Sequence, residues 1–490
     1  MESQPLVLAL DIGTSSTRAL AFDAQGHKVG QAVQYAYHQT TTPDGGIETD
    51  ADALLELTAR CIDELLPHLN QPVIAVGTCS FWHSLMAVSA DGQPATKVLS
   101  WADNRAAAWV PALRALLNEH DTHARTGCVF HPSYWPAKLL WLHQSQPELF
   151  QDNIRWMSFA EYAALRLFGE AHCSLSMASG TGIFHQVNCE WDDDTLAALP
   201  IKRDQLSPLC DAHDALPHLQ PEWAKRWPAL KDAKWFPALG DGACSNIGSG
   251  CVTPSHIAMN VGTSGALRVV LENYQDPAPH GLWRYRIDRK RSVMGGALSN
   301  AGNVWKWAHD TLNLPPDFEA QLADLEPMSH GLTVLPFLAG ERSPLWDANA
   351  RYVLAGASLD TSPVEILRAS LEAVALRFAE VAFAVRKAIP EAPPDVDIVF
   401  SGGALEGSSV WAQIMSDCIG TPLVESREKE ASARGAALMA LEACGVIEDI
   451  GAVPSDRGQE LQPTPAHHEL YKRALERQNA LYEHLYGATH

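Results

Sequence analysis

The feature that most constrains the fold is a motif that occurs twice, once in each half of the chain. It consists of an apolar run, a turn rich in Gly, Thr and Ser, and a second apolar run. The first copy spans residues 7–22 and turns at 13–16; the second spans 257–271 and turns at 262–265. Each copy predicts a β-hairpin. Two such hairpins so far apart favour two lobes of related architecture.

Predicted helices alternate with predicted strands along the rest of the chain, which indicates an α/β fold. The clearest helix is expected over residues 363–388, where apolar residues recur every three or four positions. Ser362 and Glu365 have the spacing of a capping box at its start. Further helices are expected over 51–66 and 431–444.

The chain has 490 residues, too many for a single hydrophobic core. We expect an N-terminal lobe over 1–250, a C-terminal lobe over 251–450 and a helical tail over 451–490. The irregular, polar stretch 207–228 suggests that the link between the lobes lies nearby.

Charge and composition exclude several classes of partner. The chain has 36 Lys and Arg against 58 Asp and Glu, a net charge of −22, which repels nucleic acid and anionic membranes. The N-terminus lacks the pattern of a signal peptide, and no apolar segment approaches the ~20 residues that span a bilayer. The ten cysteines form no CxxC pair or zinc-type spacing. We therefore expect a cytoplasmic protein that binds neither nucleic acid nor membrane.

The first turn carries groups suited to binding phosphate. Gly13 lets the backbone approach a ligand closely, and the amides and hydroxyls of Thr14 and Ser15 can donate to phosphate oxygens. Asp11 can hold Mg²⁺ directly or through water, and Arg18 can reach a phosphate. The motif is not a Walker A loop. The alternative is an ordinary hairpin with a polar turn.

Two further motifs suggest chemistry. Asp241 stands between two glycines in a weakly polar stretch, as suits a general base that accepts a hydroxyl proton. Alternatively, it caps a helix that starts near Ala243. Gly402 and Gly403 follow a predicted strand and precede a helix expected from about Ser408, a junction that can let a flat adenine ring approach the backbone.

Together these motifs resemble the FGGY carbohydrate kinases, a branch of the actin-like ATPase superfamily. The resemblance runs from about residue 6 to 445, and further matching stretches are 80–84, 101–105, 340–344 and 428–437. It implies two actin-like (ribonuclease H-like) lobes with a catalytic cleft between them. It also implies an ATP-dependent kinase that transfers the γ-phosphoryl group to a hydroxyl of a small sugar or sugar acid.

The resemblance also implies roles for individual residues. Asp241 is the expected catalytic base and also lies at the substrate, and Asp11 the expected Mg²⁺ ligand. The expected sugar contacts are Trp82, His83, Asp103 and Arg105. The expected nucleotide-binding residues are Asp11, Gly13, Thr14, Ser15, Arg18, Gly262, Thr263, Gly302, Lys306, Gly402, Gly403 and Ala404.

Within this family, several stretches are most similar to gluconate kinases, among them 101–105, 126–132 and 176–184. D-Gluconate is therefore the preferred substrate, with D-xylulose or another ketose or polyol as the alternative. A sugar acid needs its carboxylate neutralised by Arg or by His donors. The candidates are Arg105, His83, His131 and Lys138.

Two departures from the family leave details open. The family often has Met where this chain has Trp82, which can reshape the sugar pocket. The segment 405–409 is one residue longer than usual, so its nucleotide contact is unassigned. Whether the protein forms a homodimer is left open.

Two other interpretations of the function are a nucleotide-binding sensor without kinase activity and an actin-like ATPase that acts on proteins. Asp11 and Asp241 argue against the sensor.

Overall fold

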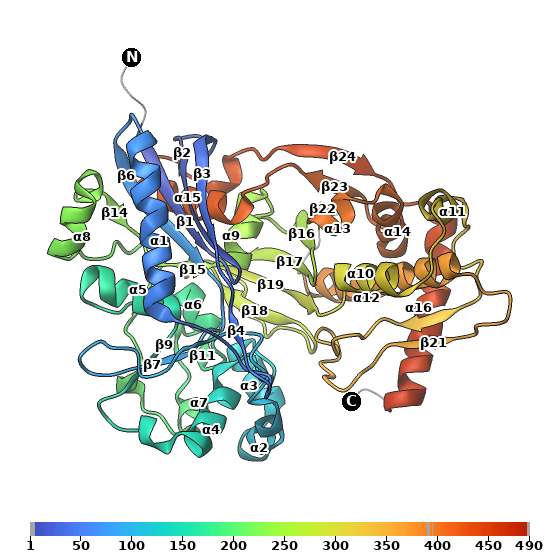
Figure 1. The fold of residues 1–490 in the computed structure, drawn as a ribbon, viewed down its shortest axis with the longest axis horizontal. Coiled ribbons are helices and arrows are strands. Elements are labelled where there is room, and N and C mark those ends of the chain that lie inside the picture. Colours follow the sequence, from blue (N-terminus) through green and yellow to red (C-terminus); the bar gives the residue numbers. More distant parts are fainter. Residues whose placement is uncertain (1–4, 390–392, 394, 488–490) are drawn as a thin grey trace.

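The structure, a computed structural model, describes residues 5–389, 393 and 395–487. Two lobes lie side by side, the N-terminal one on the left of Figure 1 and the C-terminal one on the right. Each lobe is built around one large mixed β-sheet. The described part of the chain contains no helix long and apolar enough to cross a membrane.

The first sheet contains the first predicted hairpin. Its strand order is β14-β6-β1-β2-β3, with β15 also paired to β6. The hairpin strands β1 and β2 are antiparallel, and β6 runs parallel to β1 on its other side. The strands are β1 (Leu6–Ile12), β2 (Ser16–Phe22), β3 (Lys28–Ala36), β6 (Val73–Ser80), β14 (Lys234–Trp235) and β15 (Leu239–Gly240).

The second sheet repeats this arrangement around the second hairpin. Its order is β18-β19-β17-β16-β22-β23-β24, so β19-β17-β16-β22 corresponds to β3-β2-β1-β6. The directions agree as well, since β16 is antiparallel to β17 and parallel to β22. The strands are β16 (His256–Val261), β17 (Gly265–Glu272), β18 (Trp283–Arg286), β19 (Arg291–Leu298), β22 (Asp397–Ser401), β23 (Leu423–Ser426) and β24 (Arg457–Leu461).

Every residue of β1 is buried because helices cover both faces of its sheet. Successive side chains point to opposite faces, so Leu8 packs in one core cluster with Leu54 of α1 (Ala51–Leu65). Val7 packs in another cluster with Ala436 of α15 (Ala431–Ala443). Both predicted helices are confirmed. Helix α15 lies in sequence between β23 and β24 of the second sheet, yet it packs on β1 and β6 of the first sheet (Figure 1).

The second lobe is organised around the longest helix, α12 (Pro363–Ala388), which has the predicted capping box of Ser362 and Glu365. The segment expected as a helical tail contains β24, which pairs with β23, before its helix α16 packs against α14. The remaining helices and strands of this lobe are α10 (Gly302–Thr311), α11 (Phe318–Asp324), α13 (Gly403–Glu406), α14 (Ser409–Ile419), α16 (Pro465–Tyr486), β20 (Thr333–Leu335) and β21 (Val353–Ala355).

The prediction that stretch 207–228 adjoins the link between the lobes is wrong. Trp223 and Trp227 in this stretch are buried in the core of the first lobe. The chain passes to the second sheet only after α9 (Asp241–Gly248), over residues 249–255. The sequence of this stretch looks irregular because its helices and strands are short. Burial of Trp223 and Trp227 attaches it to the first lobe.

A large insertion between β6 and β14 completes the first lobe, and most of it forms the lower half of the lobe in Figure 1. Its helices are α2 (Val110–Leu116), α3 (Glu119–Thr126), α4 (Trp135–Ser145), α5 (Phe159–Phe168), α6 (Leu175–Ser179), α7 (Asp193–Leu196) and α8 (Pro221–Arg226), of which α8 lies near β14 at the upper left. Its short strands are β7 (Met86–Val88), β8 (Val98–Leu99), β9 (Arg155–Met157), β10 (Cys173–Ser174), β11 (Phe184–His185), β12 (Glu190–Trp191) and β13 (Leu209–Cys210); β4 (Thr40–Thr41) and β5 (Ile47–Thr49) precede α1.

Candidate active site

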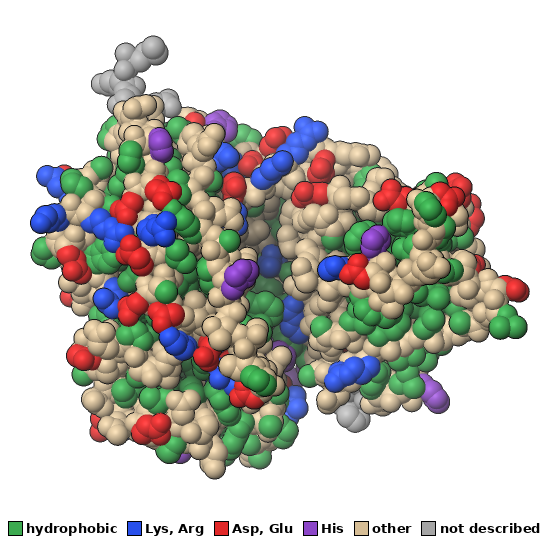
Figure 2. Space-filling model, in the orientation of Figure 1, with side chains coloured by type: hydrophobic (Ala, Val, Ile, Leu, Met, Phe, Trp, Pro, Cys, Tyr) green, Lys and Arg blue, Asp and Glu red, His purple; other side chains and the backbone are tan. Residues whose placement is uncertain are grey.

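A cavity of about 400 Å³ lies between the two lobes. Figure 2 shows the molecule hollowed between its lobes, with Lys or Arg and His side chains inside the hollow. Both hairpins contribute to the wall. The lining residues are Thr14, Phe81, Trp82, His83, Trp101, Ser133, Tyr134 and Asp241 from the first lobe, and Asn260, Ser264, Gly265, Ala266, Arg268, Trp283, Tyr285, Ala297, Arg342 and Trp346 from the second.

Asp11 is held in place at the end of β1. The thiol of Cys79 on the neighbouring strand β6 donates to its Oδ1 at 3.3 Å, and Arg18 Nε on β2 lies 3.5 Å from its Oδ2. Arg18 also binds Glu430 at 2.8 Å, just before α15. Burial raises the pKa of Asp11, and the Arg18 charge opposes that rise.

A magnesium ion fits this environment through one carboxylate. The described residues include no cluster of three or more His, Cys, Asp or Glu side chains that could hold a metal. Mg²⁺ commonly binds through one or two carboxylates, with water and substrate phosphates as its other ligands. Asp11, at the tip of the first hairpin, matches that pattern.

Asp241 opens helix α9 directly after β15, and Gly240 is the N-cap. The alternative that Asp241 caps a helix starting near Ala243 is wrong, because the helix starts at Asp241 itself. Oδ1 of Asp241 accepts a hydrogen bond from the Gly242 amide at 2.7 Å. Burial raises the pKa of Asp241 from its usual 3.8 to about 6; the nearby Asp11 carboxylate adds to the rise and Arg268 opposes it.

The second hairpin faces the cavity from the other lobe. Ser264 and Asn260 line the wall, and the turn is closed by the Gly262 amide donating to Ser264 O at 3.0 Å. The start of α10 lies against the same turn, since the amide of Gly302 donates to Gly262 O at 2.9 Å and that of Asn303 to Thr263 O at 3.1 Å. Gly302 is thus packed behind the turn.

A second cavity, of about 230 Å³, lies in the C-terminal lobe. Of the predicted nucleotide-binding residues, Gly403 and Ala404 line it. From the unassigned segment 405–409, it is Gly407, Ser408 and Ser409 that reach the cavity; the rest of the lining is Trp305, Phe318, Glu319, Leu322 and Val410. Gly402 adopts a left-handed φ of 108° where a Cβ would meet Val261 O at 2.5 Å, so the backbone there requires glycine.

Lys306 is placed away from both cavities. Its side chain is 74% exposed and pairs with Asp310 one helical turn later on α10, at 2.6 Å. In this conformation the ammonium group of Lys306, which was expected to meet the nucleotide, is paired with the Asp310 carboxylate.

Trp82 occupies a space created by glycines. A Cβ on Gly240 would lie 1.8 Å from the Trp82 ring, and one on Gly180 would lie 2.7 Å from it. The indole Nε1 donates to Ser176 O at 2.9 Å. Trp82 is bulkier than the Met that is common in the family, and it fits here because the glycine backbone at residues 180 and 240 lies directly against its ring.

His83 and Trp82, two of the expected sugar contacts, both line the cavity. His83 has a left-handed φ of 67°, which a non-glycine residue adopts only where its surroundings enforce it. Burial lowers the pKa of His83 to about 3, so its imidazole is neutral. A neutral imidazole and the ring faces of Trp82, Trp283 and Tyr285 can bind the hydroxyls and C–H faces of a sugar.

The structure does not bring Asp103 and Arg105 into the cavity lining. Asp103 is buried and receives a hydrogen bond from Ile47 N at 3.2 Å. Arg105 pairs with Asp103 at 2.5 Å and with Glu48 at 3.0 Å, and its guanidinium stacks over Trp141. Both charges are satisfied within the first lobe.

The other candidates for neutralising a carboxylate are also engaged. Burial lowers the pKa of His131 to about 3, and its Nδ1 lies 3.0 Å from Ser133 Oγ. Lys138 donates to the backbone carbonyls of Ser100 at 2.7 Å and Ser133 at 2.9 Å, and to that of His83 at 3.2 Å. Lys138 thus holds three loop segments together behind the cavity.

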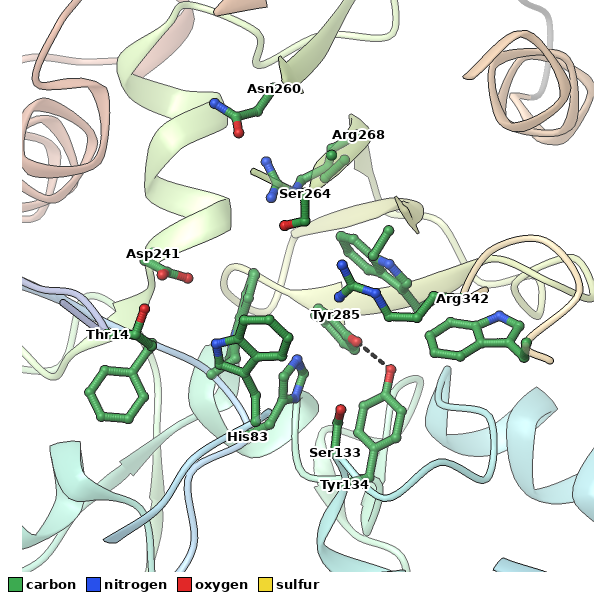
Figure 3. Close-up of a pocket in the computed structure, with 18 residues that line it drawn as sticks. Thr14, His83, Ser133, Tyr134, Asp241, Asn260, Ser264, Arg268, Tyr285 and Arg342 are labelled. Carbon is green, nitrogen blue, oxygen red and sulfur yellow. Dashed lines mark hydrogen bonds between the residues drawn. The ribbon is translucent and has the colours of Figure 1, made fainter. Parts of the chain in front are cut away.

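Sequence reasoning missed the two cations that do line the cavity. Arg268 interrupts the apolar part of strand β17, and a charge between buried apolar residues is a signal that could have found it. Arg342 lies in the stretch 340–344, which was matched to the family but given no role. Tyr134 and Tyr285 were also missed; their hydroxyls are 2.6 Å apart across the lobes (Figure 3).

Comparison with known proteins agrees with this architecture. Residues 6–248 match the N-terminal domain, and residues 257–444 the C-terminal domain, of the FGGY family of carbohydrate kinases. The chain is 29% identical to a gluconokinase of Bacillus subtilis, covering 94% of this chain and 91% of that protein. It is 25% identical to a xylulose kinase of the same species, covering 91% and 89%. A crystal structure of gluconate kinase from Lactobacillus acidophilus superposes with a TM-score of 0.92 at 27% identity, covering 99% of both chains.

These matches define a two-lobed sugar phosphotransferase with the actin-like, ribonuclease H-like fold, as predicted. The chain belongs to the FGGY family of carbohydrate kinases. Kinases of this family use ATP and a sugar substrate, and the prediction of a carbohydrate kinase is confirmed.

Proposed function

We propose that this protein transfers the γ-phosphoryl group of ATP to a hydroxyl of a small sugar acid, with D-gluconate as preferred substrate. The observation that carries the proposal is the position of Asp241. Among the described residues that line the cavity between the lobes, it is the only carboxylate. It lies in the wall that also contains Thr14 from the first hairpin.

In the proposed reaction Asp241 accepts the proton of the attacking hydroxyl. A pKa of about 6 leaves it deprotonated at neutral pH while making it more basic than an ordinary aspartate. The Gly242 amide, bound to Oδ1, fixes the orientation of the carboxylate. The other oxygen, Oδ2, is then left to meet the substrate.

The hairpin turns are proposed to bind the phosphates from both lobes. Thr14 and Ser264 approach the cavity from opposite lobes, next to the amides and hydroxyls of their turns. Arg18 adds a positive charge behind the first turn. Asp11 would hold Mg²⁺, which when bound neutralises phosphate charge. Little covalent chemistry is required of the protein, because phosphoryl transfer is catalysed mainly by positioning and charge stabilisation.

The adenosine is proposed to occupy the second cavity. Gly403 and Ala404 provide flat backbone there, and Trp305 and Phe318 provide aromatic surface. Gly302 lies between this cavity and the second hairpin: a Cβ there would be 3.1 Å from the Ala404 Cβ and 2.5 Å from Gly262 O. The base and the phosphates would thus bind to adjoining parts of one lobe.

The preference for gluconate is supported by relatives named gluconokinase and gluconate kinase, which match over almost the entire chain. D-Xylulose is the second candidate, because relatives named xylulose kinase match over nearly the same length. The cavity wall is rich in aromatic and hydroxyl groups, which would suit either substrate.

The test is ATP-dependent ADP release with gluconate, D-xylulose, L-ribulose and glycerol, with the phosphorylated product identified by mass spectrometry. We expect gluconate to give the highest kcat/KM. Turnover no higher than the ATP-only background with every substrate would refute the proposal. Asp241→Ala should abolish phosphoryl transfer while ATP affinity stays near the wild-type value; full turnover in that variant would remove Asp241 from the mechanism.

A further inference from the structure

The cavity between the lobes contains more positive than negative charge. Its charged lining residues are Arg268, Arg342 and Asp241, two guanidiniums against one carboxylate. His83 also lines it, but burial keeps its imidazole neutral. The whole chain, in contrast, carries a net charge of −22. A cavity with excess positive charge in so acidic a protein is suited to anionic ligands.

Arg342 has no carboxylate partner among the described residues. Its Nε donates to Ser299 Oγ at 3.3 Å and one terminal nitrogen donates to Leu298 O at 3.1 Å. The charged or ionisable groups that influence it are Tyr134, Tyr285 and Arg268, and burial lowers its pKa to about 10. These contacts fix the side chain from behind and leave guanidinium N–H groups that can donate into the cavity.

Several interior arginines are neutralised by carboxylates, whereas Arg284 and Arg286, which do not line the cavity, donate to backbone carbonyls. Arg377 pairs with Glu341, the residue next to Arg342, at 2.8 Å, and Arg368 pairs with Glu372 at 2.7 Å. Arg105 pairs with Asp103 and Glu48. A desolvated guanidinium without an anion is costly, because its charge is compensated only when an anionic ligand arrives.

The two cavity arginines lie at different places relative to the proposed base. Arg268 is the positive neighbour whose charge opposes the rise in the pKa of Asp241. Figure 3 shows Asp241 and Thr14 on one side of the cavity, Arg342 on the other, and His83 and Tyr285 between them. A substrate with its reacting hydroxyl at Asp241 would therefore extend its far end towards Arg342.

We propose that Arg342 binds the carboxylate of the substrate, so that the site selects open-chain sugar acids whose carboxylate lies at the end opposite the phosphorylated hydroxyl. This inference rests on the proposed function and assigns its specificity to one residue. A planar guanidinium whose orientation is already fixed can donate two parallel hydrogen bonds to a carboxylate. The Trp101 ring, 5.4 Å from the guanidinium carbon, supports its plane. Arg268 is left to act at the reacting end.

The test compares gluconate with D-sorbitol, which has a hydroxymethyl group in place of the carboxylate. Arg342→Met should lower kcat/KM for gluconate by roughly 10- to 100-fold, the range expected for a hydrogen bond between charged groups, mostly through KM. It should leave kcat/KM for sorbitol little changed. Arg342→Lys should fall between, because it keeps the charge but loses the paired donors.

Two controls separate the outcomes. Arg268→Lys should lower kcat for gluconate and sorbitol by the same factor, because Arg268 lies beside Asp241. ADP binding to each variant, measured by calorimetry, verifies that the fold is intact. If Arg342→Met does not bind ADP, the comparison of gluconate with sorbitol is made with Arg342→Lys instead.

Equal losses for gluconate and sorbitol in the Arg342 variants would overturn the assignment while leaving the kinase proposal standing. Loss of the acid preference in Arg268→Lys alone would also overturn it. A wild-type protein that phosphorylates another aldonate but not gluconate would refute the gluconate preference and support the Arg342 assignment. Wild-type turnover with neutral sugars alone would refute both.

Discussion

Replacing Asp241 by Asn tests the proposed base through both activity and stability. The substitution keeps the shape of the side chain and an oxygen that can accept from the Gly242 amide, but it removes the negative charge. We expect kcat to fall by about 10²- to 10⁴-fold, the usual contribution of a positioned general base. ATP affinity should change little, because the adenosine is proposed to bind elsewhere.

The same variant should be more stable than the wild type at neutral and alkaline pH. The pKa of Asp241 is raised in the folded protein, so folding becomes less favourable as the pH rises from about 4 to about 6, where the unfolded chain has lost this proton and the folded protein still holds it. The difference between 3.8 and about 6 corresponds to at most about 3 kcal/mol. Water in the cavity screens the half-buried charge, so we expect a gain of about 1–3 kcal/mol at pH 8.

The assay is urea unfolding followed by tryptophan fluorescence at pH 5 and pH 8. With these pKa values about half of the effect is already present at pH 5, so the stability difference between variant and wild type should grow towards pH 8. Asp103→Asn is a matched control: Asp103 is a buried aspartate whose charge is paired with Arg105, so its loss should destabilise the protein. A variant that keeps wild-type turnover, or whose stability difference does not increase with pH, would refute the reasoning.

Three further predictions follow from the same contacts. The kcat/KM for the sugar should decline below about pH 6 as Asp241 becomes protonated, and a pH–rate profile that is flat down to pH 5 would contradict this. Gly240→Ala should lower both the stability and the activity, because the added Cβ would lie 1.8 Å from the Trp82 ring. Adding Trp82→Met to this variant should partly restore its thermal stability and turnover. If it does not, the Trp82 ring is not the obstacle. Gly302→Ala should raise KM for ATP more than KM for the sugar, because the added Cβ would lie 2.5 Å from Gly262 O, behind the proposed phosphate-binding turn. Equal changes of the two KM values in steady-state kinetics would count against phosphate binding by this turn.

The features that sequence predicted well are those that short-range chemistry controls. The hairpin at residues 7–22 forms because a turn of small polar residues separates two apolar runs, and all its signals lie within a few residues of one another. The capping box of Ser362 and Glu365 is equally local. Asp11 and Asp241 stand out because a carboxylate at the end of an apolar strand or between glycines is conspicuous in any context.

Packing decided where other segments lie. Helix α15 is recognisable from sequence, but its position on the first sheet depends on contacts with β1 and β6, hundreds of residues earlier in the chain. Trp223 and Trp227 belong to a stretch with no regular sequence pattern, yet both are core residues of the first lobe. Burial of apolar surface drives such placements, and the partner surface is not encoded next to the residue that it covers.

The positive charge that lines the cavity was also decided by tertiary structure. Sequence reasoning gave Arg105 as one of four candidates to meet a carboxylate, with His83, His131 and Lys138. In the folded chain Asp103 and Glu48 neutralise Arg105, whereas Arg342 comes from a distant loop and has no carboxylate partner among the described residues. The sequence by itself thus determined the hairpins and the class of enzyme. Only the tertiary structure could determine which arginines are paired with a carboxylate, because that depends on which carboxylates the fold places beside each one.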